Sequence, residues 1–320
     1  MNMWEEAPKT EIFGIQVYTF GLYCAIGAVC AVAAICLLCR AEKLKKGTGS
    51  LLSCLSIVCG IIVSRLTFCI LDGIEAGWMP LPYWFNITTG GWTLFGAVFG
   101  ALGGAWICAK ITGESSSLLG DIVCCALPLA MAAERYSERM FELFNVSRQL
   151  RENGFPKNTF LAVSDPYYSD VSYMATYLAG AIGCLILFLI LVFFLTRSRR
   201  EGDLRILFLL LCGAGGILLE SLRYDHFLEF SFVRFEQVMA AILLVWGVIV
   251  AAGRNRERKG LRIAAYVSLP VMIGTLIFIE FALDRSSWSH YLLYAMMTAA
   301  LAMPVVLGVM LLRKRGKEAA

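Results

Sequence analysis

The chain has 320 residues, of which 59% are hydrophobic and 16% charged, and its formal net charge is +4. Mean hydropathy is +0.71, and windows of roughly 20 apolar residues, the length that crosses a bilayer, recur from end to end. This composition excludes an ordinary soluble domain and predicts a polytopic membrane protein. The net charge requires no nucleic-acid partner, because short basic connections account for it.

We predict an all-α transmembrane bundle of nine spans. They cover residues 16–39, 51–71, 92–111, 118–133, 173–196, 206–222, 235–253, 263–283 and 291–312. Alternate connections form two sets, and one set carries roughly twice as many Lys and Arg residues as the other. The positive-inside rule then predicts an outer N-terminus and a cytoplasmic C-terminus. Residues 1–11 are acidic rather than basic, so the first span is predicted to be a permanent helix and not a cleaved signal.

Disulfide and metal sites are not expected. All 12 cysteines fall within the predicted spans, away from external loops where an oxidising compartment could pair them. The chain has only two histidines, His226 and His290, which makes a zinc or haem site improbable. We therefore predict no cofactor and no metal.

Two external segments are long enough to cover the membrane face. Residues 134–172 are rich in polar and turn residues and can form a small cap, but not an independent domain. Residues 72–91 contain Trp78, Tyr83 and Trp84, whose rings settle at the level of the lipid headgroups. Both segments are predicted to border a lateral entrance that faces the lipid.

Charged side chains lie in or at the end of several spans. They are Arg65, the pair Glu134 and Arg135, Glu220, and Arg223. A charge at membrane depth costs about 2.5–3.5 kcal/mol on insertion scales, so it is retained mainly where it faces a protein interior or a substrate. We therefore expect function at these residues.

Alternation of the spans places several polar positions toward the outer leaflet. They are Gly90, Gly91, Arg135, Arg223 and Gln237. We expect them to converge on one face, although each arginine could instead reach the interface independently. Arg65 lies about four turns inside its span, where it needs a buried partner or a water-filled cavity.

Six short motifs occur in a fixed order. They are residues 20–27 (FGLYCAIG), 64–66 (SRL), 90–96 (GGWTLFG), 121–129 (DIVCCALPL) followed by Glu134 and Arg135, 219–225 (LESLRYD), and Gln237. Their order and spacing resemble those of the bacterial prolipoprotein diacylglyceryl transferase family. The resemblance covers residues 16–253. We therefore expect a transferase-like membrane domain over residues 1–253, with residues 254–320 as an additional hairpin that packs on the bundle.

The resemblance implies transfer of diacylglyceryl from phosphatidylglycerol to a cysteine thiol of a lipoprotein precursor, on the outer side of the bacterial cytoplasmic membrane. Phosphatidylglycerol or another anionic phospholipid, and the precursor peptide, are the implied partners. Arg135 would bind the phosphate, because a guanidinium holds such anions bidentately. Glu220 and Arg223 would organise the pocket as an ion pair. The remaining implied binding positions are Arg65, which would set the potential, Gly90 and Gly91, whose amides would approach the headgroup, and Gln237.

The chain also departs from the family motifs. Phe20 stands where the family has Tyr, Phe95 where it has His, Gly216 where it has Arg, and Glu138 where it has Asn. Leu143 stands where the family has Glu, although Glu142 is adjacent. We therefore expect other side chains to have taken over the chemistry, and the candidates are Glu138, Glu142, Tyr18 and His226.

Two further hypotheses remain open. The first is a catalytically silent relative that binds anionic lipid or a peptide, which the residues Phe20, Phe95 and Gly216 favour. The second is a small transporter that uses the intramembrane charges as a pathway. A site reachable from both sides of the membrane would distinguish transport from the other two functions.

Overall fold

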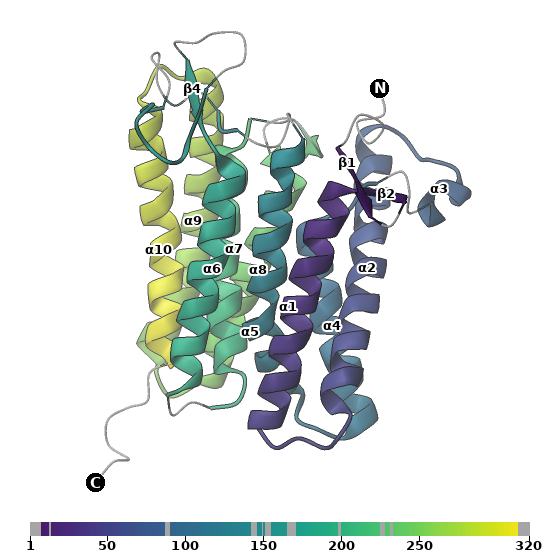
Figure 1. Cartoon of the computed structure of the whole chain (residues 1–320). Coiled ribbons are helices and arrows are strands. Elements are labelled where there is room, and N and C mark those ends of the chain that lie inside the picture. Colours follow the sequence, from purple (N-terminus) through teal and green to yellow (C-terminus); the bar gives the residue numbers. More distant parts are fainter. Residues whose placement is uncertain are drawn as a thin grey trace.

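A computed structural model shows a bundle of long helices that run roughly parallel to one another (Figure 1). The structure describes residues 8–312, apart from 13, 87–89, 142–145, 149, 151–154, 165–170, 198–199, 225–227 and 231–232. The long helices are α1 (Thr19–Ala41), α2 (Thr48–Glu75), α4 (Leu94–Thr112), α5 (Ser116–Ser137), α6 (Thr176–Leu195), α7 (Asp203–Leu222), α8 (Phe235–Arg254), α9 (Lys259–Arg285) and α10 (His290–Leu312).

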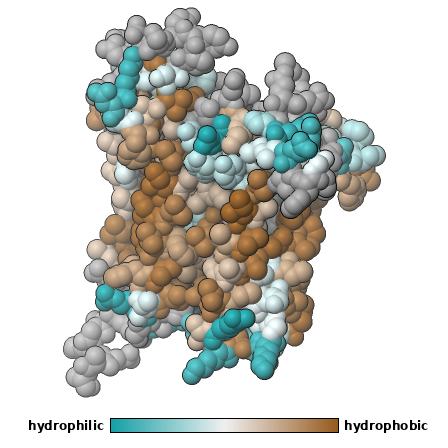
Figure 2. All heavy atoms as spheres, in the orientation of Figure 1, coloured by the Kyte–Doolittle hydropathy of each residue, from teal (hydrophilic) through white to brown (hydrophobic). Residues whose placement is uncertain are grey.

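Within these described ranges, nine helices are long and apolar enough to cross a membrane. The predicted helical bundle of nine spans is therefore confirmed. α1 begins at the end of the bundle where the short strands lie, and α10 ends at the opposite end (Figure 1). The face of the bundle seen in Figure 2 is broadly hydrophobic over its middle, whereas hydrophilic residues gather at its two ends. Side chains such as Val29, Leu37 and Leu189, each more than 60% exposed, belong to this lipid-facing surface.

Short hairpins decorate the end of the bundle at which α1 begins. β1 (Lys9–Ile12) pairs with β2 (Ile15–Tyr18), β3 (Ala162–Ser164) with β4 (Ser172–Met174), and β5 (Glu229–Phe230) with β6 (Val233–Arg234), all antiparallel. The predicted first span began at residue 16, but residues 16–18 are extended and the helix begins at Thr19. Gly14, with a φ of +79°, makes the turn that folds β2 back onto β1.

The remaining elements at this end are a short helix and a single helical turn. α3 (Leu81–Phe85) projects from the loop that follows α2, and η2 (Glu138–Met140) extends α5. The rings of Trp78 and Trp84 stack beside α3, with centroids 6.3 Å apart and an interplanar angle of 12°. Two of the three aromatic residues predicted for the loop 72–91 thus form this stack, whereas the ring of Tyr83 lies beside Arg65.

Glycines bring α2 and α4 into close contact. A Cβ on Gly100 would lie 2.3 Å from the carbonyl oxygen of Cys59, and one on Gly104 would lie 2.5 Å from that of Leu55. No other residue fits at these two positions, because the backbone of the facing helix cannot move aside. The contact holds the N-terminus of α4 beside the upper part of α2.

Candidate functional site

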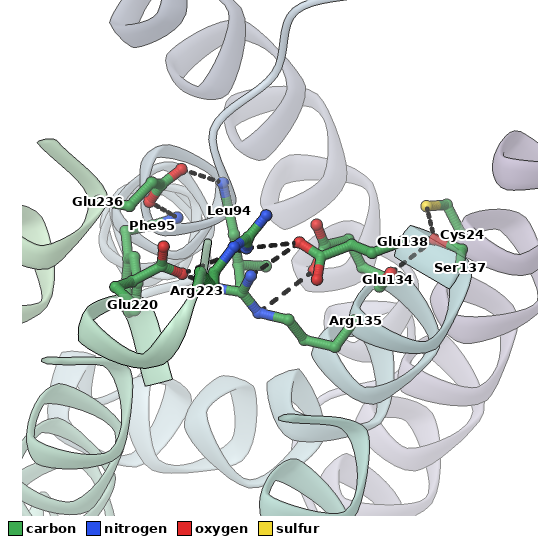
Figure 3. A network of polar contacts seen from close by, with 10 residues as sticks. All are labelled: Cys24, Leu94, Phe95, Glu134, Arg135, Ser137, Glu138, Glu220, Arg223 and Glu236. Carbon is green, nitrogen blue, oxygen red and sulfur yellow. Dashed lines mark hydrogen bonds and ion pairs between the residues drawn. The ribbon is translucent and has the colours of Figure 1, made fainter. Parts of the chain in front are cut away.

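Two arginines and two glutamates meet at one end of the bundle (Figure 3). Arg135 lies in the last turn of α5, and Glu138 begins η2. Glu220 lies in the last turn of α7, and Arg223 follows α7 directly. Arg135 donates to Glu138 Oε1 at 2.8 Å and to Glu220 Oε1 at 2.6 Å. Arg223 Nη1 donates to the same Glu138 Oε1 at 2.8 Å and lies 3.5 Å from Glu220 Oε1. We call these four residues the ion-pair quartet.

The quartet is buried and formally neutral. The side chains of Arg135 and Glu220 are only 3% and 2% exposed, and those of Arg223 and Glu138 are 7% and 9% exposed. Buried charges survive only when they are paired, because desolvation costs several kcal/mol for each ion. The structure thus brings together Arg135, Arg223, Glu220 and Glu138, and shows that each guanidinium already binds a carboxylate.

Residues 146–148 bind the backbone around the end of α7, next to the quartet. Arg148 N donates to Leu222 O at 2.8 Å, and Tyr224 N donates to Val146 O at 3.2 Å. Ser147 forms a β-bridge with Arg223 and is fully buried. The described part of the predicted cap therefore holds the residue that follows α7 in an extended conformation, which directs the Arg223 side chain into the quartet.

A largely apolar cavity of about 330 Å³ adjoins the quartet. Its walls come from α4, α5, α6 and α7, and its lining includes Arg135 together with Gly180, Gly183, Gly215 and Gly216. Gly183 and Gly215 leave room that larger side chains would fill, since a Cβ on either would meet no atom within 4 Å. The arrangement combines an apolar space with a guanidinium at its boundary, which suits a molecule with an acyl chain and an anionic group.

Two departures from the family motifs touch one another. A Cβ on Gly216 would lie 2.4 Å from Cζ of Phe95, a residue that is 1% exposed. The ring of Phe95 therefore occupies the space in which a side chain at position 216 would begin. Phe20, the third departure, packs on Phe141 with ring centroids 5.3 Å apart.

Arg65 belongs to a separate cluster. Its guanidinium donates to the carbonyl oxygens of Tyr83 at 2.7 Å, Asn86 at 3.0 Å and Gly91 at 2.9 Å, and also to those of Trp84 and Gly90. Burial in this cluster raises the pKa of Tyr83 above its ordinary value. Arg65 thus binds the backbone of residues 83–86 and 90–91, and its hydrogen-bond partners among the described residues given above do not include the ion-pair quartet.

Gly90 and Gly91 also serve this loop. Both have positive φ, +70° and +80°, and a Cβ on Gly91 would lie 2.3 Å from the ring of Phe68. Their carbonyl oxygens face Arg65. The amides that follow them are also engaged, since Glu236 accepts from Leu94 N at 2.8 Å and from Phe95 N at 3.2 Å (Figure 3). The role of the two glycines in headgroup binding stays a prediction.

Gln237 joins a third cluster, which involves the C-terminal hairpin. Gln237 Nε2 donates to Glu280 Oε1 at 2.6 Å, and Glu280 is 2% exposed. Arg148 Nη1 donates to Asp284 Oδ1 at 2.8 Å, and its Nη2 lies 3.9 Å from Glu280 Oε2. α9 is thereby tied both to α8 and to the cap above the quartet.

Glu236 was not predicted from the sequence, and Glu134 was singled out there as a charged residue without a specific role. Glu236 caps the N-terminus of α4, where a negative charge complements the helix dipole. Glu134 lies beside Arg135, with Oε2 3.8 Å from Arg135 Nε. Glu236 is an acidic group in the first turn of an apolar helix, and this signal could have marked its position. Glu142 and His226 lie outside the described residues, and Tyr18 ends β2. No cluster of three metal-ligating side chains occurs among the residues searched, which are those with a described placement.

Comparisons with known proteins agree on one family. The sequence profile of the prolipoprotein diacylglyceryl transferase family matches residues 9–253. A phosphatidylglycerol–prolipoprotein diacylglyceryl transferase from Thermotoga petrophila is 29% identical over 202 residues, covering 60% of this chain and 65% of the relative. Proteins of the same name from Clostridioides difficile and Staphylococcus xylosus are 21% and 26% identical, over 78% and 65% of this chain and 95% and 74% of their own lengths. The chain thus spans about 65% of the length of the Thermotoga relative.

Proposed function

The chain belongs to the prolipoprotein diacylglyceryl transferase family, and from this premise we propose that it transfers a diacylglyceryl group from phosphatidylglycerol to the thiol of a lipoprotein precursor. Family membership confirms the resemblance found in the motifs. We further infer that this multi-pass membrane protein works at the outer face of a bacterial cytoplasmic membrane, with its N-terminus outside. Residues 1–253 would form the transferase domain, residues 134–172 its cap, and residues 254–320 an addition.

The observation that carries the proposal is the sharing of one oxygen atom by two guanidiniums. Glu138 Oε1 lies 2.8 Å from both Arg135 Nη1 and Arg223 Nη1. A non-bridging oxygen of a phosphodiester would fit the same place, since arginine binds phosphate and carboxylate oxygens with similar geometry. Glu138 therefore occupies the proposed phosphate position, and the headgroup can bind there only when this carboxylate moves away.

The cavity supplies the other half of the proposal. Arg135 lies at its boundary, and its remaining walls are mostly apolar. A phospholipid whose phosphate binds Arg135 and Arg223 can place an acyl chain in this space, where burial from water is favourable. On this proposal Glu220 holds Arg135 in position, and Arg65, Gly90, Gly91 and Gln237 act through the loop and helix ends around the site. A role for Glu142 stays a prediction.

The test is a turnover assay with the full-length chain in phosphatidylglycerol micelles and a synthetic lipobox peptide. The expected products are a thioether-linked peptide and glycerol phosphate. Arg135→Ala should abolish product formation, because the phosphate loses its main partner. Arg285→Ala is the matched control, since Arg285 is exposed at the end of α9, away from the quartet.

A silent lipid-binding relative is the second candidate function. The contact between Phe95 and Gly216 favours it, because two polar family positions are replaced by one apolar pair. In that case the chain binds phosphatidylglycerol but releases no glycerol phosphate. Saturable lipid binding that depends on Arg135, without any product at the highest enzyme concentration, would establish this alternative.

A further inference from the structure

We propose that Glu134 is the general base that takes the proton from the acceptor thiol, in place of the family-motif histidine whose position Phe95 occupies. This inference rests on the transferase function proposed above. It assigns a catalytic task to a residue at which the family motif has glycine, so the resemblance does not supply it. The argument starts from the carboxylate oxygens of the site, because a base needs a lone pair that no strong donor already occupies.

Four carboxylates lie in or beside the ion-pair quartet, and three of them already accept hydrogen bonds. Glu138 Oε1 accepts from both Arg135 and Arg223. Glu220 Oε1 accepts from Arg135 and also lies near Arg223. Glu236 accepts backbone N–H groups of α4 with both of its oxygens. At least one oxygen of each of these groups thus already accepts a charge-assisted or helix-capping hydrogen bond.

Glu134 differs from the others in both bonding and exposure. Its Oε2 is buried and accepts no hydrogen bond from the residues that the structure describes. Its side chain is 24% exposed, compared with 9% for Glu138 and 2% for Glu220. Glu134 therefore combines a buried oxygen that no donor occupies with a side chain that is more exposed than those of Glu138 and Glu220.

The surroundings of Glu134 suit a thiolate that forms next to the phosphate site. Arg135 Nε lies 3.8 Å from Glu134 Oε2, while the Nη atoms of the same guanidinium face the quartet. Ser137 Oγ, at the end of α5, donates to the backbone carbonyl oxygen of Glu134 at 2.5 Å and lies 3.9 Å from Sγ of Cys24 on α1 (Figure 3). One arginine thus separates the proposed base from the proposed phosphate position by the width of its guanidinium.

The proposed step balances as follows. Glu134 takes the proton of the thiol. The resulting sulfur anion attacks the carbon of the diacylglycerol moiety that is bonded to the phosphate oxygen. A C–S bond forms while the C–O bond to the phosphate breaks, and its electron pair leaves with glycerol phosphate as a dianion. The proton on Glu134 then passes to water, so the enzyme is restored without an oxidant, a metal or a further reactant.

The experiment compares Glu134→Gln, Glu134→Asp and the unchanged chain over a range of pH, with phosphatidylglycerol micelles and the lipobox peptide. Glu134→Gln should lower kcat by about 10²–10⁴-fold near neutral pH while leaving KM for the lipid within a few fold. Its activity should recover above about pH 8.5, where a free thiol ionises without help. Glu134→Asp should retain part of the activity.

The matched control is Glu114→Gln, the same substitution in the loop that precedes α5 at the opposite end of the bundle. It should leave kcat and its pH profile unchanged. If Glu134→Gln turns over within threefold of the unchanged chain, or if its loss is the same at every pH, Glu134 is not the base. If the unchanged chain itself gives no product, the proposed function fails, which is a distinct result.

Discussion

Phe95 and Gly216 fit one another as a pair: the ring on α4 fills the volume that a side chain on α7 would need, with Cζ 2.4 Å from the position of a Cβ at residue 216. The two residues replace a histidine and an arginine of the family motifs. The loss of the polar groups is therefore one correlated change in packing. A change at either position alone must disturb the other.

This relationship predicts that Gly216→Arg destabilises the protein. Overpacking a buried contact costs about 1–3 kcal/mol, and here the new side chain also brings a charge. We expect a clearly lower melting temperature in detergent for the single variant. The double variant with Phe95→His should recover much of the loss, because the smaller imidazole frees the space. A double variant no more stable than Gly216→Arg would contradict the complementary packing.

The shared oxygen of Glu138 predicts a gain in lipid affinity when its charge is removed. Glu138→Asn restores the family residue and leaves Arg135 and Arg223 with one carboxylate, Glu220, between them. Phosphatidylglycerol should bind at least several-fold more tightly, whereas the free protein should melt at a lower temperature. Titration with phosphatidylglycerol, with phosphatidylcholine as the reference lipid, measures the first effect. Weaker binding of phosphatidylglycerol would mean that Glu138 is part of the lipid site itself.

The cavity predicts an effect of a single glycine. A Cβ on Gly183 meets no atom within 4 Å, yet Gly183 lines the cavity. Gly183→Leu should therefore fill the space without straining α6, and it should raise KM for phosphatidylglycerol about tenfold or more. Gly103→Leu in α4 is the matched control, because a Cβ there also meets nothing and Gly103 does not line the cavity. Equal KM values for the two variants would show that no acyl chain uses this space.

The contact between Arg148 and Asp284 predicts that the C-terminal hairpin supports the cap. Arg148→Ala releases the cap from α9 and should lower kcat severalfold by loosening Arg223, whose carbonyl oxygen Arg148 also approaches at 3.4 Å. Asp284→Ala removes only the ion pair between Arg148 and residue 284 and leaves the contact of Arg148 with Arg223, so kcat should fall less. The charge exchange Arg148→Asp with Asp284→Arg should restore part of the activity lost in Arg148→Asp. Failure of that exchange would leave the hairpin as a passive neighbour.

The sequence predicted the bundle well because apolar length is a local property. Nine stretches long enough for a bilayer could be read directly, and the charged ends of the fourth and sixth spans indicated Arg135, Glu220 and Arg223. The sequence did not predict that residues 16–18 form a strand, since Val17 and Tyr18 also suit the start of an apolar helix. Hydropathy did not distinguish these two structures, and the turn at Gly14 decided the outcome.

The site was harder to predict where partners lie far apart in the chain. Arg65 was expected near the other arginines, but nearby carbonyl oxygens of the loop 83–91 surround it. Glu236 caps a helix that begins about 140 residues earlier, and no spacing rule connects the two. The fit of Phe95 to Gly216 is likewise a property of two facing helices. Such relationships depend on three-dimensional packing that the order of residues along one helix does not contain.

The length of α2 has a consequence for the membrane around the protein. Its 28 residues extend about 42 Å at 1.5 Å per residue, whereas a hydrocarbon core is about 30 Å thick. The helix must therefore tilt or extend beyond the hydrocarbon core. The stacked rings of Trp78 and Trp84 lie just beyond its end and mark its position relative to the headgroups. Bilayer thickness should therefore affect the position of α2 and of the loop that leads into α4, because Arg65 on α2 binds that loop.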